Sequence, residues 1–386
     1  MKQRYALLIL LLSIHVLTGY GNNSRASQKV YEERDSTVSS RVNDLIGIPD
    51  EIAALIYSKT KDFPKQTQLA IAMVNGDQVS YYGTVNDQGT LIATDNRDRI
   101  FEIGSITKLF TSVLLSSLAA EGKIDPEEDI NHYYPFPFHG ERSITFASLA
   151  SHTSGLPRLP ANLVLTDLTN PYKHYGKEEL EAYLQEMLTF DQEAGVKYSY
   201  SNLGAGLLGH TLSLSQQTGF DLLLQQRVFE PYGMNSSYVG TVENDERLVA
   251  GRDMTGEITP NWDFDVLAGA GAVRSSVTDL ARFAIAQFNS SDKVLALTRI
   301  PRFKVDEHMQ MGLGWHILTD EMGKRLYWHN GGTGGYSSSF MLQPEQKRAV
   351  IILSNVSAFH PETGTIEQLC FELIRNLNQP RKGEQP

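Results

Sequence analysis

The chain has 386 residues, 41% of them hydrophobic and 20% charged, so it can bury a sizeable core as one large domain or two closely connected ones. Its net charge of −11, without a cluster of Lys and Arg, argues against a general nucleic-acid-binding protein, because clustered cations bind a phosphate backbone. Cys370 is the only cysteine and no His-Glu-x-x-His pair occurs, so neither a disulfide, a metal site nor another cofactor is expected.

The first 26 residues have the pattern of a secretory signal peptide. A basic start precedes the apolar run 6–17, which is too short for a comfortable membrane span, and small residues follow it. Tyr20 stands where a bacterial lipoprotein would need its lipid-bearing Cys. We therefore expect an exported protein, periplasmic or secreted, with a flexible lead-in over residues 27–44 and no stable membrane span in the mature chain. A buried N-terminal helix is the alternative.

Helical and hairpin patterns follow this N-terminal region. Residues 45–57 carry apolar side chains at helical spacing, and Asn75-Gly76 stands between the β-rich runs TQLAIAMV and VSYYGTV, which predicts a hairpin. Ser276 and Asp279 have the spacing of a capping box before another helix. Between the predicted hairpin and this capping box, helical patterns occur in SITKLFTSVLLSSLAAEG, KEELEAYLQEML, LGAGLLGHTLSLSQQTG and FDLLLQQRVFEPYG.

The last third of the chain returns to β patterns, in MGLGWHIL, KRLYWHNG, SSSFMLQP and RAVIILSNV, and a helix over residues 365–377 closes it. Strands at both ends with helices between them predict an α/β (α+β) fold. An antiparallel sheet would be flanked by N- and C-terminal helices and would carry an inserted all-helical lobe. The sheet domain would comprise residues 45–112 and 265–378 and the lobe residues 113–264, with a ligand cleft between them.

The pattern Ser-x-x-Lys occurs three times, and its surroundings distinguish one match. The matches at 58–61 and 290–293 lie in polar stretches typical of a solvated surface. Ser105 and Lys108 instead begin an apolar helical run and share one helix face, where a helix start offers free N–H groups to an oxyanion. Burial can lower the pKa of Lys108 until its amine accepts the serine proton. A capping Ser beside a surface Lys is the alternative interpretation.

Two later segments could complete a site. Tyr200 and Asn202 stand where a loop enters another apolar helix; a phenolate can exchange protons with a serine, and an amide can bind a carbonyl or hold a lysine. The segment His-Asn-Gly at 329–331 ends a predicted strand, where backbone N–H groups could complete an oxyanion hole with that of Ser105. Taken singly, these segments are equally compatible with a packed Tyr, a helix cap and a structural His.

In this order the three motifs resemble those of the β-lactamase-related serine hydrolases, which include class C β-lactamases, D-alanyl-D-alanine carboxypeptidases, D-aminopeptidases and certain esterases. The motifs are Ser105-x-x-Lys108, Tyr200-x-Asn202 and His329-x-Gly331. Further stretches resemble the family, among them SITFASLASHTSGLP, PYGMNSSYVG and AGAGAVRSSVTDLARF. The resemblance spans residues 45–375 and implies the family's fold and its reaction class.

The resemblance implies a role for each motif residue. Ser105 would be the acylated nucleophile, and Lys108 with Tyr200 would form its proton relay. The substrate-binding residues would be Asn202, His329, Gly331 and Gly332, the last sharing the oxyanion hole with the N–H of Ser105. Metal ions would have no part in the reaction.

The third motif departs from the Lys-Thr-Gly of well-known class C β-lactamases. His329 is expected to be only partly protonated at neutral pH, and Asn330 offers an amide in place of a threonine hydroxyl. Because a fixed positive charge suits the carboxylate of a β-lactam, the sequence supports acylation by a β-lactam more strongly than it supports efficient hydrolysis of one.

These observations predict an exported serine hydrolase that cleaves the amide bond of β-lactams or of D-Ala-D-Ala-type peptides through an acyl-enzyme on Ser105. Its partner would be a small-molecule β-lactam or a peptidoglycan-type peptide, with no nucleic acid. A carboxylesterase or acyltransferase of the same fold and a penicillin-binding sensor that acylates without turnover are the alternatives. The sequence indicates neither the oligomeric state nor the acyl group.

Overall fold

The computed structural model describes residues 45–165, 167–242, 244–320 and 323–378. The predicted signal peptide, residues 1–26, and the predicted lead-in over 27–44 lie outside this range. Within it, no helix combines the length and the apolar character that a membrane crossing requires.

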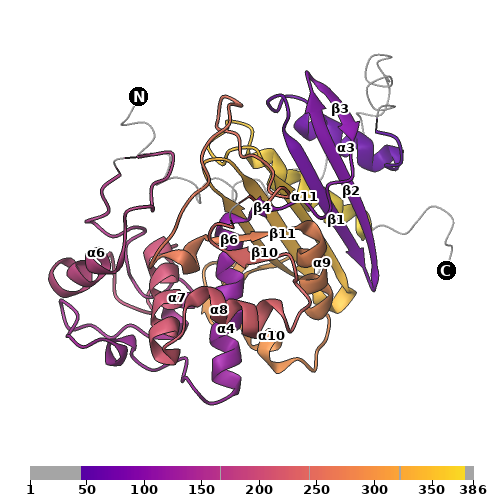
Figure 1. Ribbon diagram of the computed structural model, residues 1–386. Coiled ribbons are helices and arrows are strands. Elements are labelled where there is room, and N and C mark those ends of the chain that lie inside the picture. Colours follow the sequence, from indigo (N-terminus) through magenta and orange to yellow (C-terminus); the bar gives the residue numbers. More distant parts are fainter. Residues whose placement is uncertain (1–44, 166, 243, 321–322, 379–386) are drawn as a thin grey trace.

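A nine-stranded antiparallel sheet forms the centre of the molecule, with a helical lobe to one side (Figure 1). Its strands, in spatial order, are β3 Thr90–Ala93, β2 Gln78–Asp87, β1 Gln68–Asn75, β12 Arg348–Ser354, β11 Ser337–Gln343, β10 Arg325–Gly332, β9 His316–Thr319, β8 Met309–Met311 and β7 Phe303–Lys304. The first and last strands of the chain lie side by side, with Ile71 of β1 opposite Ile352 of β12. The predicted sheet built from distant parts of the chain is therefore confirmed.

The predicted hairpin joins β1 to β2 through a two-residue loop. Asn75 pairs with Gln78, so the loop is Gly76-Asp77, one residue later than the Asn-Gly signal suggests. Gly76 has φ +62°, which glycine adopts readily and which suits the first position of a tight hairpin turn.

Two terminal helices, α3 Asp50–Thr60 and α11 Gly364–Leu377, pack against each other and cover one face of the sheet (Figure 1). The first helix begins five residues later than predicted, because Gly47 has φ +86° and Pro49 precedes the first turn. Cys370 is buried in α11, where its thiol donates to Val350 O at 3.4 Å.

Side chains of the central strands divide alternately between two cores, because successive residues of a strand point to opposite faces. In β1, Ile71 packs with α3 and α11, whereas Ala72 faces the second core, which continues into the helical lobe. The helix α9 Val277–Ala286 covers this second face, and Ser276 caps it by accepting from the N–H of Asp279.

The lobe is built around α4 Thr107–Ala120, in which twelve of fourteen residues are buried. A helix that is apolar on every side belongs in the interior. Its companions are the α-helices α5 Phe146–Ala150, α6 Lys177–Ala182, α7 Asn202–Gln216, α8 Phe220–Leu224 and α10 Lys293–Thr298, with π-helical turns at Tyr183–Met187 and Gln225–Phe229. The predicted boundary between residues 112 and 113 lies inside α4.

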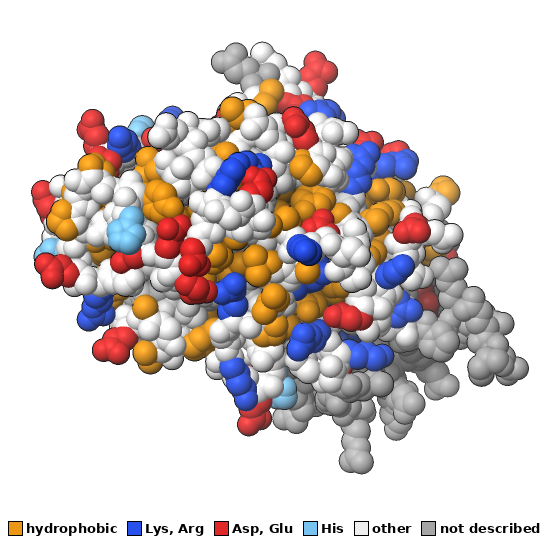
Figure 2. Space-filling model, turned by 90° about the horizontal axis from the view of Figure 1, so that it is seen from below, with side chains coloured by type: hydrophobic (Ala, Val, Ile, Leu, Met, Phe, Trp, Pro, Cys, Tyr) orange, Lys and Arg blue, Asp and Glu red, His pale blue; other side chains and the backbone are white. Residues whose placement is uncertain are grey.

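A small second sheet joins the lobe to the central sheet. It consists of β4 Phe101–Glu102, β6 Val273–Ser275 and β5 Tyr238–Val239, in the order β4-β6-β5. Glu102 and Arg274 form a buried ion pair there at 3.2 Å, so the residues just before Ser105 are firmly anchored. On the face of the molecule shown in Figure 2, acidic and basic side chains are interspersed.

Candidate active site

Ser105 lies where β4 passes into α4. It occupies the 3₁₀ turn η2 Gly104–Ile106, directly before the first residue of α4, as the predicted helix start requires. Gly104 has φ +51°, and a Cβ on it would lie 2.5 Å from Gly332 N, so only glycine lets this turn approach β10 so closely. Ser338 of β11 donates to Ile103 O at 2.9 Å and fixes the turn from the other side.

Lys108 points from the first turn of α4 into the protein and is 2% exposed. Its Nζ lies 3.0 Å from Ser105 Oγ, 3.0 Å from Asn202 Oδ1 and 2.7 Å from Ala270 O. Burial, and after it the positive charge of Arg158, hold the pKa of Lys108 well below its usual range. A lowered pKa increases the fraction of the amine that is neutral and can act as a base.

Asn202 is the first residue of α7, whose cap is Ser201, accepting from Gly204 N at 2.8 Å. The Asn202 amide links two walls of the site, because its oxygen accepts from Lys108 and its nitrogen donates to the Tyr172 hydroxyl at 3.1 Å. The amide thereby fixes the position of the lysine amine.

Tyr200 precedes that cap and reaches Ser105 from the side of α7. Its hydroxyl hydrogen bonds with Ser105, and Lys108 Nζ lies 4.9 Å from its ring centre. Burial raises the pKa of Tyr200 to about 12, so the phenol is protonated at neutral pH. The structure thus brings together Ser105, Lys108, Tyr200 and Asn202 from parts of the chain about 95 residues apart.

His329 lies in β10 behind Tyr200, with 6.4 Å between the ring centres, and its side chain is fully buried. Burial, together with the neighbouring His316, holds the pKa of His329 well below its usual range. The ring is therefore neutral at pH 7, and the partial positive charge expected from the sequence is wrong. His316 of the adjacent strand β9 and Tyr200 of the loop before α7 lie against the ring, and the second of them is distant from it in sequence.

Asn330 also differs from its expected role in the site. Because neighbouring residues of a strand face opposite ways, its side chain points toward α11, where its amide donates to Glu367 at 3.3 Å. The amide therefore does not take the place of a threonine hydroxyl beside Ser105.

Gly331 and Gly332 bring the end of β10 against the Ser105 turn. A Cβ on Gly331 would collide with Ile103 O and lie 2.9 Å from Ser105 N. Thr333 N donates to Tyr336 O at 2.9 Å, and successive donors of an antiparallel strand point to opposite sides. The N–H of Gly332 therefore points away from β11, on the side where Gly104 lies.

A narrow pocket of about 20 Å³ opens at Ser105, with Asn202 and Gly332 among the residues that line it. Its outer wall is aromatic: the rings of Tyr172 and Phe264 stack at 4.7 Å, and Trp262 meets Tyr172 edge-on at 5.5 Å. Loop 158–175, which carries Tyr172, is expected from the sequence to line the cleft, but the aromatic side chains themselves cannot be singled out, because they come from irregular loops without periodic pattern.

The other two Ser-x-x-Lys matches lie on the surface, as their polar surroundings suggest. Ser58 and Ser290 are exposed, and Lys61 is paired with Asp62 at 2.5 Å. Burial of the lysine thus separates the match at Ser105 from the two others.

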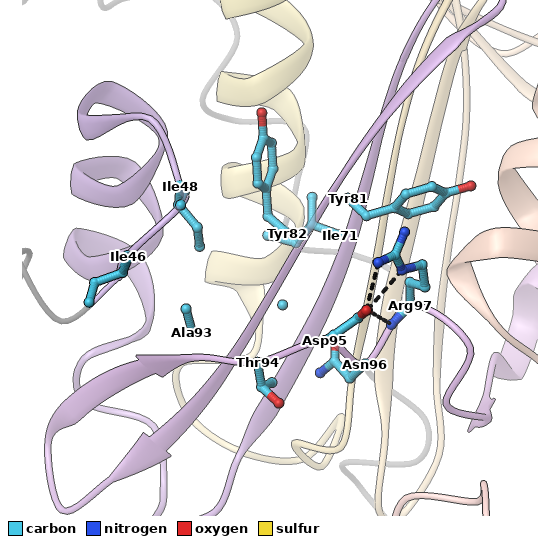
Figure 3. Close-up of a pocket in the computed structure, with 12 residues that line it drawn as sticks. Ile46, Ile48, Ile71, Tyr81, Tyr82, Ala93, Thr94, Asp95, Asn96 and Arg97 are labelled. Atoms are coloured by element: carbon cyan, nitrogen blue, oxygen red, sulfur yellow. Dashed lines mark hydrogen bonds and ion pairs between the residues drawn. The ribbon is translucent and has the colours of Figure 1, made fainter.

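A larger groove of about 330 Å³ lies elsewhere, between the start of α3 and strands β2 and β3 (Figure 3). Asp95 and Arg97 form an ion pair at 2.6 Å in its wall, and Ile46, Tyr82 and Ala93 contribute apolar surface. None of the predicted site residues lines this groove, so the narrow pocket remains the candidate active site.

Among the described residues, no group of three or more His, Cys, Asp or Glu side chains could hold a metal ion.

Comparison with known proteins identifies the family of the chain. The family model described as Beta-lactamase matches residues 61–369. A protein named Beta-lactamase from Providencia stuartii is 31% identical over 196 residues, which are 49% of this chain and 48% of that protein. The chain therefore spans about half the length of this curated relative.

Two solved structures share the fold. The structure titled Beta-Lactamase/D-Alanine Carboxypeptidase from Pseudomonas syringae aligns with a TM-score of 0.69 at 22% identity, over 89% of this chain and 100% of that one. The class C beta lactamase from Rhodobacter sphaeroides aligns with a TM-score of 0.71 at 18% identity, over 86% of this chain and 100% of that one.

Proposed function

Since the chain belongs to the β-lactamase family, we propose that it is a serine hydrolase that forms an acyl-enzyme on Ser105. One observation carries the proposal: the amine of Lys108, buried and with a lowered pKa, lies 3.0 Å from Ser105 Oγ. This geometry meets the requirement for an activated nucleophile, which is a serine within hydrogen-bonding reach of a base.

In the proposed first step, neutral Lys108 takes the proton of the Ser105 hydroxyl while Oγ bonds to the carbonyl carbon of the substrate. The C–N bond then breaks, and the proton passes through the Tyr200 hydroxyl to the leaving nitrogen. The oxyanion is bound by the N–H groups of Ser105 and Gly332, each of which typically contributes about 3 kcal/mol in the transition state. Water then attacks the acyl-enzyme, and the acid product leaves with Ser105 regenerated.

The substrate class that we propose is a β-lactam or a D-Ala-D-Ala-type peptide. This rests on the family and on the pocket, where Asn202 can offer its second amide hydrogen to a substrate carbonyl.

A carboxylesterase or acyltransferase is favoured by a different observation. The neutral, buried His329 supplies no fixed charge for a carboxylate, and the aromatic wall around Tyr172 suits an apolar acyl group.

The test is intact-protein mass spectrometry after incubation with a fluorescent penicillin. The wild-type protein should gain one ring-opened penicillin, located on Ser105 by peptide mapping, and Ser105→Ala should gain none. Ser290→Ala removes the serine of a surface Ser-x-x-Lys match and serves as the matched control, which should label as the wild type does. No adduct on the wild type, together with no cleavage of a D-alanyl-D-alanine peptide, would contradict the proposal.

A substrate panel distinguishes the alternatives. The values of kcat/KM for nitrocefin, a D-alanyl-D-alanine peptide and a p-nitrophenyl ester should rank an amide first if the leading proposal holds, and the ester first if the esterase does. A stoichiometric burst of nitrocefin opening without later turnover would instead identify a penicillin-binding sensor.

Export to the periplasm or the medium is part of the proposal and rests on residues 1–26. Cell fractionation of the full-length chain in a Gram-negative host should recover a shortened protein outside the cytoplasm, and a full-length protein in the cytoplasm would contradict export.

A further inference from the structure

Arg158 lies at the edge of the catalytic pair, on the loop that follows α5. Its guanidinium is centred 5.1 Å over the ring of Tyr200, the same ring beside which Lys108 Nζ lies at 4.9 Å. The main chain fixes the loop to the start of α7, because Arg158 O accepts from Asn202 N at 3.0 Å and from Leu203 N at 3.1 Å. Two basic side chains, the buried Lys108 and the half-buried Arg158, are thus held against one aromatic ring.

The remaining titratable groups around this ring come from four separate segments, and burial keeps all of them neutral at pH 7. Burial lowers the pKa of each histidine and raises the pKa of each tyrosine. These groups are His152, Tyr172, Tyr198, His316 and His329. Among the groups that act on Lys108 and Tyr200 within the described residues, Arg158 is therefore the one with a fixed charge.

We propose that Arg158 is a positioning residue whose guanidinium, held over the Tyr200 ring, keeps Lys108 in the neutral form that can accept a proton. Two neighbouring positive charges repel each other, most strongly where one of them is buried, so the charge of Arg158 disfavours protonation of the amine. The same charge favours negative charge on the Tyr200 oxygen while a proton passes through it. The effect of Arg158 on the protonation of Lys108 does not depend on the proposed function, whereas its effect on the acylation of Ser105 rests on that function.

The sign of the expected change follows from this repulsion. Without the charge of Arg158, protonated Lys108 is less unfavourable, so its pKa rises and the neutral fraction at pH 7 falls. If Lys108 is the base, the acylation rate then begins to fall at a higher pH as the solution is made more acidic. The acid limb of the pH–rate profile therefore moves to higher pH.

The direct test is the titration of Lys108 by NMR in protein labelled with ¹³C at lysine Cε, with the resonance assigned from its absence in Lys108→Ala. Arg158→Gln and Arg158→Met remove the charge, and they should raise the midpoint by about one pH unit. Arg158→Lys restores a cation and should return the midpoint toward the wild-type value. Arg142→Gln is the matched control, because Arg142 lies 5.0 Å over the Phe190 ring in the same lobe, and the midpoint should not move.

Equal midpoints in wild type, Arg158→Gln and Arg158→Met would overturn the inference. The Met variant keeps the apolar stem of the side chain, so it remains informative if the Gln variant does not fold. The NMR titration needs no substrate, so it tests the role of Arg158 even if the wild-type protein is never acylated. A failure of the wild-type protein to become acylated would count against the proposed function and not against the role of Arg158.

Acylation by the fluorescent penicillin, measured against pH, links the two proposals. We expect the acid limb of the acylation rate to shift with the NMR midpoint in both charge-removing variants and to stay in place in Arg142→Gln. An unchanged limb beside a shifted midpoint would support the inference on Arg158 and contradict Lys108 as the base.

Discussion

The chemistry of the site begins with one lysine amine enclosed by neutral acceptors. Lys108 is surrounded by a hydroxyl, an amide oxygen and a main-chain carbonyl, and no carboxylate is among the groups that shift its pKa. Lys61, in one of the other Ser-x-x-Lys matches, lies on the surface against Asp62. A carboxylate partner would stabilise the ammonium form, so the absence of one among the described groups that act on Lys108 helps to keep the amine neutral and able to accept a proton.

Also at the scale of single residues, the neutral ring of His329 leads us to expect that this residue does not select substrates by their carboxylate charge. In His329→Gln, the ratio of kcat/KM for a carboxylate-bearing substrate to that for its methyl ester should stay within about twofold of the wild-type value, since no charge is lost. A cationic His329 would contribute about 1.5–3 kcal/mol to binding the carboxylate, so the ratio would then fall by about tenfold or more. A fall of that size would show that the ring carries charge in the substrate complex.

At the scale of elements, the site depends on how closely β10 approaches the turn that carries Ser105. Gly104 and Gly331 leave no room for a Cβ on either side of this contact. The same contact brings Ser105 and Gly332 to the lining of one pocket. A close contact between main chains, fixed further by the hydrogen bond from Ser338 to Ile103 O, is rigid, which suits groups that must be in place before charge develops.

Gly331→Ala should therefore disturb the site and the fold together. Its Cβ meets Ile103 O and Ser105 N, so β10 must move away from the turn. We expect acylation to slow by about 100-fold or more, the order found when an oxyanion-hole donor is lost, and stability to fall by about 1–3 kcal/mol from overpacking. The acylation burst and urea unfolding measure the two effects.

Gly364→Ala provides the matched control, because a Cβ at the start of α11 meets nothing within 4 Å. Wild-type acylation and stability in Gly331→Ala would show that the contact between β10 and the turn is adaptable.

A second contact between elements couples β10 to α11. Glu367 of α11 is 6% exposed and accepts from the Asn330 amide, and burial raises its pKa to about 8. The folded state therefore keeps a proton that the unfolded chain, with a pKa near 4.5, releases. Stability must then fall as pH rises from about 4.5 to about 8, because the unfolded state binds fewer protons over that range.

Glu367→Gln removes this titration and keeps an acceptor for Asn330. Relative to wild type, the variant should gain stability steadily from pH 5 to pH 8, by up to about 4 kcal/mol in all. Glu372→Gln, in a surface pair with Lys59 at 2.8 Å, should change stability by less than about 1 kcal/mol. Urea unfolding at several pH values measures both, and parallel curves for wild type and Glu367→Gln would contradict a buried neutral acid.

At the scale of the whole molecule, periodic patterns predict most of the elements but not their neighbours in space. The apolar run after Ser105 appears in the structure as α4, and the β runs of the last third appear as strands β9 to β12, the first of them starting five residues later than its pattern suggests. The small sheet through β4 escapes prediction, because strands of two or three residues have no detectable period.

The motif residues of the candidate site can be selected from the sequence because their order and their apolar settings are local properties. The environment of each residue is not local. His329 is neutral because the adjacent strand β9 and the distant loop before α7 bury it, and Arg158 acts on Tyr200 from a loop whose path depends on the packing of the lobe. Sequence patterns therefore identify the residue types of the site, whereas their charge states follow only from the folded chain.

Three buried histidines make the stability of the whole molecule depend on pH. Burial holds the pKa of His152 and His329 well below the usual range and that of His316 at about 4, against 6.5 for an exposed ring. Below about pH 6.5 the unfolded chain binds protons that the folded state excludes, so the free energy of unfolding must fall as pH falls. With three such groups the slope reaches about 4 kcal/mol per pH unit.

His316→Gln should reduce that slope by about 1.4 kcal/mol per pH unit between pH 6 and pH 4.5, where wild-type His316 is neutral in the folded state and charged in the unfolded one. The variant loses the hydrogen bond to the Tyr198 hydroxyl, which lowers stability at every pH, so the slope is the informative quantity. His308→Gln, at an exposed position, should keep the wild-type slope. Urea unfolding at pH 4.5, 5, 5.5 and 6 measures the slope, and equal slopes in wild type and His316→Gln would mean that the buried ring already carries its proton.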